Sequence, residues 1–101
     1  MNARARDQAL SSIESEIRAE MAASLGRVGS RLKTLLSAMA ELAASIPLLS
    51  GVSLQEALIR YRKLRDEARL YRWYLIVQRE AIGLRNHAEV DHFYPIPSNL
   101  S

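Results

Sequence analysis

Large apolar residues recur at intervals of three and four through the first half of the chain, and this spacing restricts the possible folds more than any other feature. The series runs Leu10, Ile13, Ile17, Met21, Leu25, Val28, Leu32, Leu35, Met39, Leu42 and Ile46. Such intervals place one apolar stripe along an α-helix, and from Leu25 onward they form a heptad repeat, which favours packing along a second helix. We therefore expect a helix over about residues 8–45.

Two glycines, Gly26 and Gly29, interrupt this stripe. Each costs about 1 kcal/mol relative to alanine inside a helix, so one alternative is a break at "GRVGS", with Ser30 capping a new helix. The apolar spacing passes through the glycines without a change of phase, and we therefore favour one continuous helix. The glycines would then let a second backbone approach closely.

A turn and a second helix follow. Pro47 disfavours helix, and "SG" at Ser50 is a turn signal, so we expect a turn over residues 46–52. In "SLQE", Ser53 can cap free amides while Glu56 reaches back, which predicts a helix over about residues 54–84. Its heptad positions are Leu54, Ala57, Tyr61, Leu64, Ala68, Tyr71, Leu75, Gln78 and Ile82, and Gly83 is the expected stop.

The C-terminal end predicts a short helix and an extended tail. In "NHAE", Asn86 has the position of a cap and Glu89 that of its partner, which places a helix over about residues 87–93. The prolines of "YPIP" then hold residues 94–101 extended. We expect the large apolar side chains here to pack across the helices, because exposing them would forgo about 1.5–3 kcal/mol each. They are Phe93, Tyr94 and Ile96.

These elements predict an all-α fold in one domain over residues 1–101, built as a long antiparallel helical hairpin with a short third helix and a proline-rich tail. The apolar fraction of 49% and the charged fraction of 25% are typical of a folded globular protein. A bare hairpin of two such long helices buries too little core to be stable alone. It must fold on itself or pair with another copy.

The stretch "LYRWYLIV" adds a second apolar face to the second helix, beside its heptad positions. This face consists of Leu70, Trp73, Tyr74 and Val77. It would expose several hundred Å² of contiguous apolar surface, near the upper limit for a monomer. A two-fold contact covers such a patch, so we expect a homodimer that forms a four-helix bundle, with Trp73 near the centre of the interface. The alternative is that the third helix and the tail cover the face within one chain.

Positive charge concentrates in the middle of the chain. The net charge is +3 overall but +5 over residues 27–72. Four arginines share a face of the second helix and could bind an acidic protein or phosphates: Arg62, Arg65, Arg69 and Arg72. Asp66 and Glu67 interrupt this face, and a solvated surface explains the same residues. We rank a solvated surface first, an acidic protein partner second and nucleic acid last.

Few residues suggest chemistry, and we predict no enzyme, no cofactor and no metal. The chain has no cysteine, which excludes disulfides and thiolate metal sites, and it has neither a GxSxG motif nor a glycine-rich phosphate loop. His87 and Asp91 share a helical face, but a metal site needs three or four ligands. The two histidines otherwise suit a polar outer surface.

The segment "VQREAIGLRNH" followed by "YPIP" resembles the C-terminal signature of a small family of uncharacterised bacterial helical proteins, a domain of unknown function. This resemblance implies a bacterial cytoplasmic protein and nothing about activity. In outline only, the chain also resembles the all-helical chorismate mutases, dimeric bundles with arginines, a lysine, a glutamate and a late glutamine in the active site. The lysine segment and the final helix of that family have no counterpart here. Residues that could correspond to that site are Arg18, Arg27, Arg31, Glu56 and Gln78.

The beginning of the chain, "MNARARDQALSSIESE", lacks the apolar core of a secretory signal, and its early acids are atypical of a mitochondrial presequence. No apolar run approaches the roughly 18 residues of a membrane span. We therefore expect a cytoplasmic protein without a membrane partner. The sequence as a whole predicts a small helical interaction or regulatory protein that acts as a homodimer.

Overall fold

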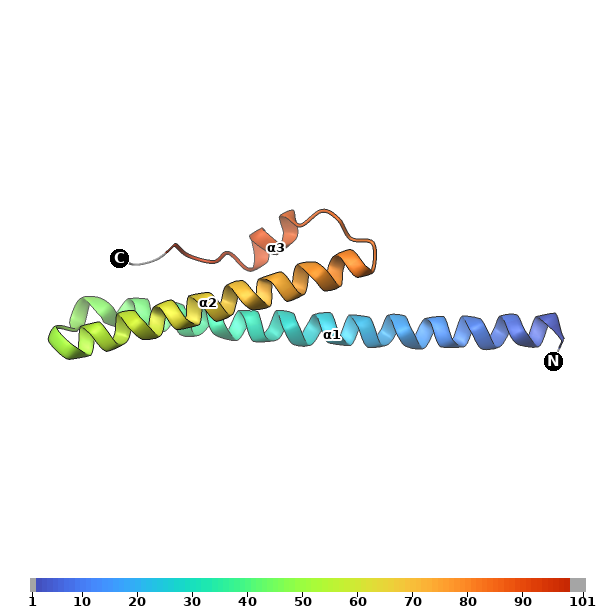
Figure 1. Ribbon diagram of the computed structural model, residues 1–101, viewed down its shortest axis with the longest axis horizontal. Coiled ribbons are helices and arrows are strands. Elements are labelled where there is room, and N and C mark those ends of the chain that lie inside the picture. Colours follow the sequence, from blue (N-terminus) through green and yellow to red (C-terminus); the bar gives the residue numbers. More distant parts are fainter. Residues whose placement is uncertain (1, 99–101) are drawn as a thin grey trace.

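A computed structural model describes residues 2–98 and has the all-helical hairpin that the sequence predicts (Figure 1). Helix α1 spans Ala3–Ser45, a short 3-10 helix η1 spans Ile46–Leu48, helix α2 spans Gly51–Ala81 and helix α3 spans Ala88–Phe93. Helices α1 and α2 run antiparallel, and α3 folds back along α2 (Figure 1). The molecule is elongated, with dimensions of 74 × 21 × 15 Å.

Helix α1 is continuous through both glycines, as the unchanged apolar phase predicted. A Cβ atom added to Gly26 would meet open space, whereas one added to Gly29 would lie 2.8 Å from the hydroxyl oxygen of Tyr94. The close approach at Gly29 is therefore made by a side chain of the C-terminal segment. The expectation of a second backbone at this point was wrong.

The turn into α2 differs from its prediction. The helix begins at Gly51 with Ser50 as its N-cap, so the predicted capping box of Ser53 and Glu56 is wrong. Gly51 has a φ of 59°, a conformation that glycine adopts at little cost, and it starts the helix before Ser53 is reached. Ser53 consequently lies inside the first turn and not at its cap.

Gly83 ends α2, as the sequence predicted, although the last helical residue is Ala81 and not residue 84. Gly83 has a φ of 91°, and its amide donates to the carbonyl oxygen of Glu80. The amide of Leu84 donates to the carbonyl oxygen of Arg79 at 2.9 Å. These two bonds form a Schellman motif, which satisfies the last carbonyls of α2 and turns the chain toward α3.

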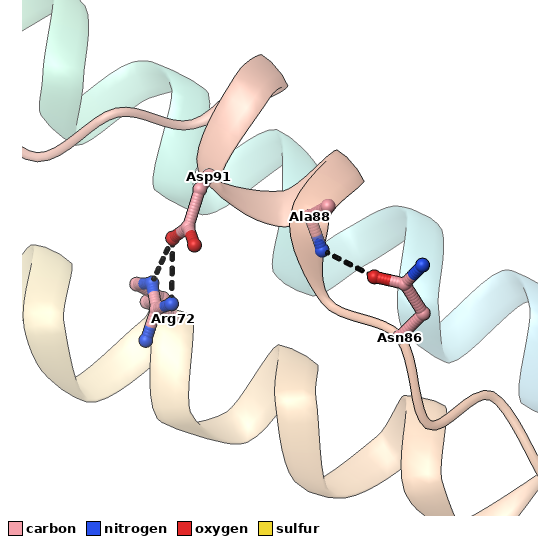
Figure 2. Close-up of polar contacts among 4 residues, drawn as sticks. All are labelled: Arg72, Asn86, Ala88 and Asp91. Carbon is pink, nitrogen blue, oxygen red and sulfur yellow. Dashed lines mark hydrogen bonds and ion pairs between the residues drawn. The ribbon is translucent and has the colours of Figure 1, made fainter.

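At the start of α3, one of the two interactions of the predicted capping box is present. The amide of Ala88 donates to Oδ1 of Asn86 at 3.0 Å, so Asn86 does satisfy a free amide (Figure 2). The N-cap position itself belongs to His87, and the Glu89 carboxylate lies 4.0 Å from Arg79. Glu89 thus pairs with α2 instead of closing the predicted capping box.

The core lies along the heptad positions of α1 and α2 and extends to α3. Its buried members are Leu32, Leu35, Met39, Tyr61, Ala68, Leu75 and Val90. Tyr94 and Ile96 pack against this cluster from the tail, as expected, whereas Phe93 is 67% exposed. Phe93 is the last residue of α3, and its ring lines a surface pocket with Pro95 and Pro97 instead of entering the core.

Helix α1 is longer than its partner helix, with 43 residues against 31 in α2. The register is fixed where Gln78 Nε2 donates to Ser24 Oγ at 2.9 Å, three residues before α2 ends. Residues 3–20 of α1 therefore extend beyond α2, as Figure 1 shows, and every one of them is exposed. We call these residues the overhang.

Candidate interaction surfaces

The four apolar residues that the sequence assigned to a second face of α2 do lie exposed on one side of that helix. Their exposed fractions range from 39% for Tyr74 to 58% for Trp73. The spacing i, i+3, i+4, i+7 places them together on the face opposite the buried Ala68 and Leu75. We call Leu70, Trp73, Tyr74 and Val77 the outer patch.

Aromatic contacts hold the outer patch in place. The Trp73 and Tyr74 rings lie 5.6 Å apart, and Tyr74 meets Tyr71 edge to face at the same centroid distance. The guanidinium of Arg31 lies 5.8 Å from the centre of the Tyr71 ring and links this cluster to α1. The patch is therefore a braced surface whose rings have restricted freedom, which lowers the entropic cost of binding.

The C-terminal segment does not cover the outer patch, so the single-chain alternative drawn from the sequence is wrong. It packs into the side of the hairpin, where Val90 is buried and Tyr94 reaches Gly29 of α1. Arg72 donates two hydrogen bonds to Asp91 Oδ1, at 3.2 and 2.6 Å (Figure 2). Arg65 Nε donates to the carbonyl oxygen of Pro97 at 2.8 Å. These anchors direct the segment along the arginine side of α2.

The arginine face is consequently divided between two roles. Arg65 and Arg72 are half-buried and hold the C-terminal segment. Arg62 and Arg69 are exposed, and neither forms a hydrogen bond or ion pair with any residue in the range 2–98. Arg69 and Trp73 line a surface pocket of about 440 Å³, together with Asp91 and Ile96 of the C-terminal segment. Only half of the predicted anionic-partner face is thus free to meet a partner.

The positive charge contributed by α1 is also paired. Arg31 donates to Glu67 of α2 at 2.6 Å, across the hairpin. This hydrogen bond and the charge of Glu67 raise the pKa of the Arg31 guanidinium above its usual value. The pair therefore reduces the net positive field that the charge distribution had suggested for the middle of the hairpin.

The residues considered for an enzyme of chorismate-mutase outline do not converge. Arg18 pairs with Glu14 at 3.6 Å on the overhang, and Arg31 pairs with Glu67. Gln78 donates to Ser24 and lines a small, mainly apolar pocket of about 150 Å³ with Met21. Arg27 and Glu56 are exposed at separate places along the hairpin. Arg18, Arg31 and Gln78 thus contact three different partners at separate places along the hairpin.

The histidines face different partners. His87 Nε2 lies 3.0 Å from Oε1 of Glu80, while Asp91 is engaged by Arg72. His92 stacks edge to face against Phe93 at the end of α3. Within residues 2–98, no three histidine, aspartate or glutamate side chains gather closely enough to hold a metal ion. No helix in that part of the chain has the combined length and hydropathy needed to cross a membrane.

Sequence reasoning missed one surface, the apolar side of the overhang. The stripe from Leu10 to Ile46 was treated as a single packing surface, yet its first residues have no helix against them. Leu10 and Ile13 are each 51% exposed, and Ile17 and Met21 are also exposed. The predicted ranges 8–45 and 54–84 already differed in length, and that difference was the available signal.

Comparison of this chain with protein-family models, with curated proteins and with solved structures found no match.

Proposed function

We propose that this protein is a helical interaction module that acts as a homodimer and contacts its second copy through the outer patch. The observation that carries this proposal is the exposure of Leu70, Trp73, Tyr74 and Val77 together on one helix face. Their exposed surface sums to roughly 400 Å², a size that on a monomer often marks an interaction site. Tryptophan and tyrosine are also the residues that most often dominate binding energy at interfaces.

The internal pairing of the polar side chains supports an interaction role over catalysis. Arg31, Arg72 and His87 are each engaged by a carboxylate of the same chain. An active site generally needs such groups to converge on a cavity with their charges available to a substrate. The outer patch, in contrast, is an apolar surface that the hairpin leaves exposed. A regulatory protein in the cytoplasm suits a chain without cysteine, since nothing in it depends on an oxidising compartment.

An acidic protein partner is the second candidate. Arg62 and Arg69 are exposed beside the patch, and Arg69 shares a pocket with Trp73, so an acidic helix with apolar side chains would meet both kinds of surface. Replacing Arg62 and Arg69 by glutamate would abolish capture of such a peptide while leaving self-association intact. If self-association weakens to the same degree, the arginines belong to the dimer contact and this second candidate fails.

Sedimentation tests the main proposal directly. The protein should run at micromolar concentration as a species of about 23 kDa, twice the 11.4 kDa of one chain. Trp73→Arg or Val77→Arg should reduce the mass to that of one chain. Ile59→Arg is the matched control, because Ile59 is 49% exposed on the same helix but lies outside the patch. A wild-type protein that stays at 11.4 kDa at every concentration contradicts the proposal.

A further inference from the structure

Within residues 2–98, the overhang and the outer patch each present an exposed apolar stripe, and the two stripes share one spacing. Leu10, Ile13 and Ile17 follow the intervals three and four on the overhang. Leu70, Trp73 and Val77 follow the same intervals in the outer patch. Met21 prolongs the first stripe and Ala81 prolongs the second, each by four residues. Two helix faces with matching intervals can interdigitate along their whole length.

The direction in which the overhang stripe faces restricts its occupant. It continues the face of α1 that carries Leu25, Leu32 and Met39, and that face packs on α2. The overhang therefore faces the line along which α2 would run if it did not end at Ala81. A helix placed there would extend the α2 layer. Its face toward the overhang must be apolar, and its opposite face must already be covered.

Helix α2 of a second copy meets both requirements. Its face with Ala68 and Leu75 is buried against its own α1, and the outer patch on the opposite face is exposed. A two-fold axis near the end of α2 and perpendicular to the helices would place the two α2 helices end to end. The overhang of each copy would then run parallel to the partner's α2. The residues of the two facing stripes would therefore follow one another in the same direction.

We propose that two copies of this protein form a dimer in which the overhang of each copy lies along the outer patch of the other, an arrangement that we call the reciprocal clasp. This inference rests on the proposed self-association and names the surface that the outer patch binds. The α2 helices would form a central layer between the two α1 helices. Each contact is made twice, and the symmetry closes the assembly at two copies.

The area that becomes buried agrees with a stable dimer. The three large side chains of the overhang stripe, together with Met21 beside it, and the four of the outer patch are each about half exposed. Together they offer roughly 800 Å² per chain, which is what a standard interface takes from each partner. The outer patch alone, meeting its own copy, would supply about half of that area and would leave the overhang uncovered.

Charge disfavours one alternative, a contact between two outer patches. Exposed Arg62 and Arg69 lie beside each patch, so a patch that meets its own copy would bring like charges together. The overhang carries both signs, with a net charge of −1 from Asp7, Glu14, Glu16 and Glu20 and from Arg4, Arg6 and Arg18.

Complementation between two variants tests the reciprocal contact. Ile13→Glu breaks the overhang and Trp73→Arg breaks the outer patch, so each variant alone should run as a monomer. In an equimolar mixture, one overhang and one patch remain intact in each mixed pair, and the damaged contact carries glutamate against arginine. The mixture should therefore recover a species of about 23 kDa, whereas under a face-to-face contact of two patches Ile13→Glu alone would already be dimeric and mixing would restore nothing.

The controls separate this inference from the proposed function. Mixing Ile13→Glu with Ile17→Glu should leave both proteins monomeric, because every overhang then carries a charge. Both residues are exposed outside the core, and circular dichroism should show unchanged helix content. If Trp73→Arg is monomeric but Ile13→Glu stays dimeric, self-association through the patch stands and the reciprocal clasp is refuted. A mixture that remains monomeric also overturns the clasp.

Discussion

The two halves of α1 have the same apolar period and opposite surroundings. Leu32 and Met39 in the C-terminal half are fully buried, whereas Leu10 and Ile13 in the overhang are each 51% exposed. The difference arises because α2 ends at Ala81 and its chain turns away at Gly83. Periodicity thus determines which face of a helix is apolar, but the length of the neighbouring helix determines whether that face becomes core.

Truncating a side chain in each half should give the largest contrast. Leu32→Ala removes a fully buried side chain and should destabilise the hairpin by about 2–5 kcal/mol at any protein concentration. Ile13→Ala removes a side chain that is 51% exposed and against which no helix of residues 2–98 packs. Its effect on urea unfolding should grow with protein concentration, because only association would bury it. An Ile13→Ala effect as large as that of Leu32→Ala in dilute solution would mean that the overhang folds onto its own chain.

Removing the C-terminal segment should lower the stability by less than Leu32→Ala does. This deletion tests apolar residues that are anchored to the hairpin, in contrast to those of the overhang. Ending the chain after Phe93 deletes Tyr94 and Ile96, which pack on the core, and breaks the hydrogen bond from Arg65 to Pro97. The melting temperature should fall by several degrees, equivalent to about 1–2 kcal/mol. Ending the chain after Ser98 keeps all of these contacts and serves as the control. An unchanged melting temperature after the longer deletion would show that the segment is not anchored.

The smallest expected effect compares two glycines in one helix. Gly26→Ala enters open space and should stabilise the protein by up to about 1 kcal/mol through helix propensity. Gly29→Ala should gain less, because its methyl group would displace the Tyr94 hydroxyl 2.8 Å away. In a Tyr94→Phe background the difference between the two alanine variants should shrink, as a double-mutant cycle would measure. Equal gains at both positions in the wild-type background would contradict this contact.

The features that could be read from the sequence are those set by local chemistry. The phase of the stripe through Gly26 and Gly29, the stop at Gly83 and the face of the outer patch all follow from helix geometry or from backbone freedom. The cap at Ser53 failed for a related reason, since Gly51 offered an equally local and earlier start. Gly51 and Ser53 are both local signals for a helix start, and the sequence alone does not show which of them determines it.

The features that could not be read depend on where one element ends relative to another. The exposed face of the overhang needs the end of α2, and the route of the C-terminal segment needs the positions of Arg65 and Arg72 relative to Gly29. The arginine face of α2 could be predicted only in part, for the same reason. Spacing placed its four arginines on one face of α2, but their division between arginines that anchor the C-terminal segment and exposed arginines depends on tertiary contacts.

The close contact between Tyr94 and Gly29 also has a consequence for the order of folding. The docking site of the C-terminal segment is composite, with Gly29 supplied by α1 and Arg65 and Arg72 supplied by α2. Neither helix alone presents the whole site, so the segment can dock only once the hairpin has closed. Docking of the segment therefore follows closure of the hairpin during folding, and its release precedes or accompanies the separation of α1 from α2.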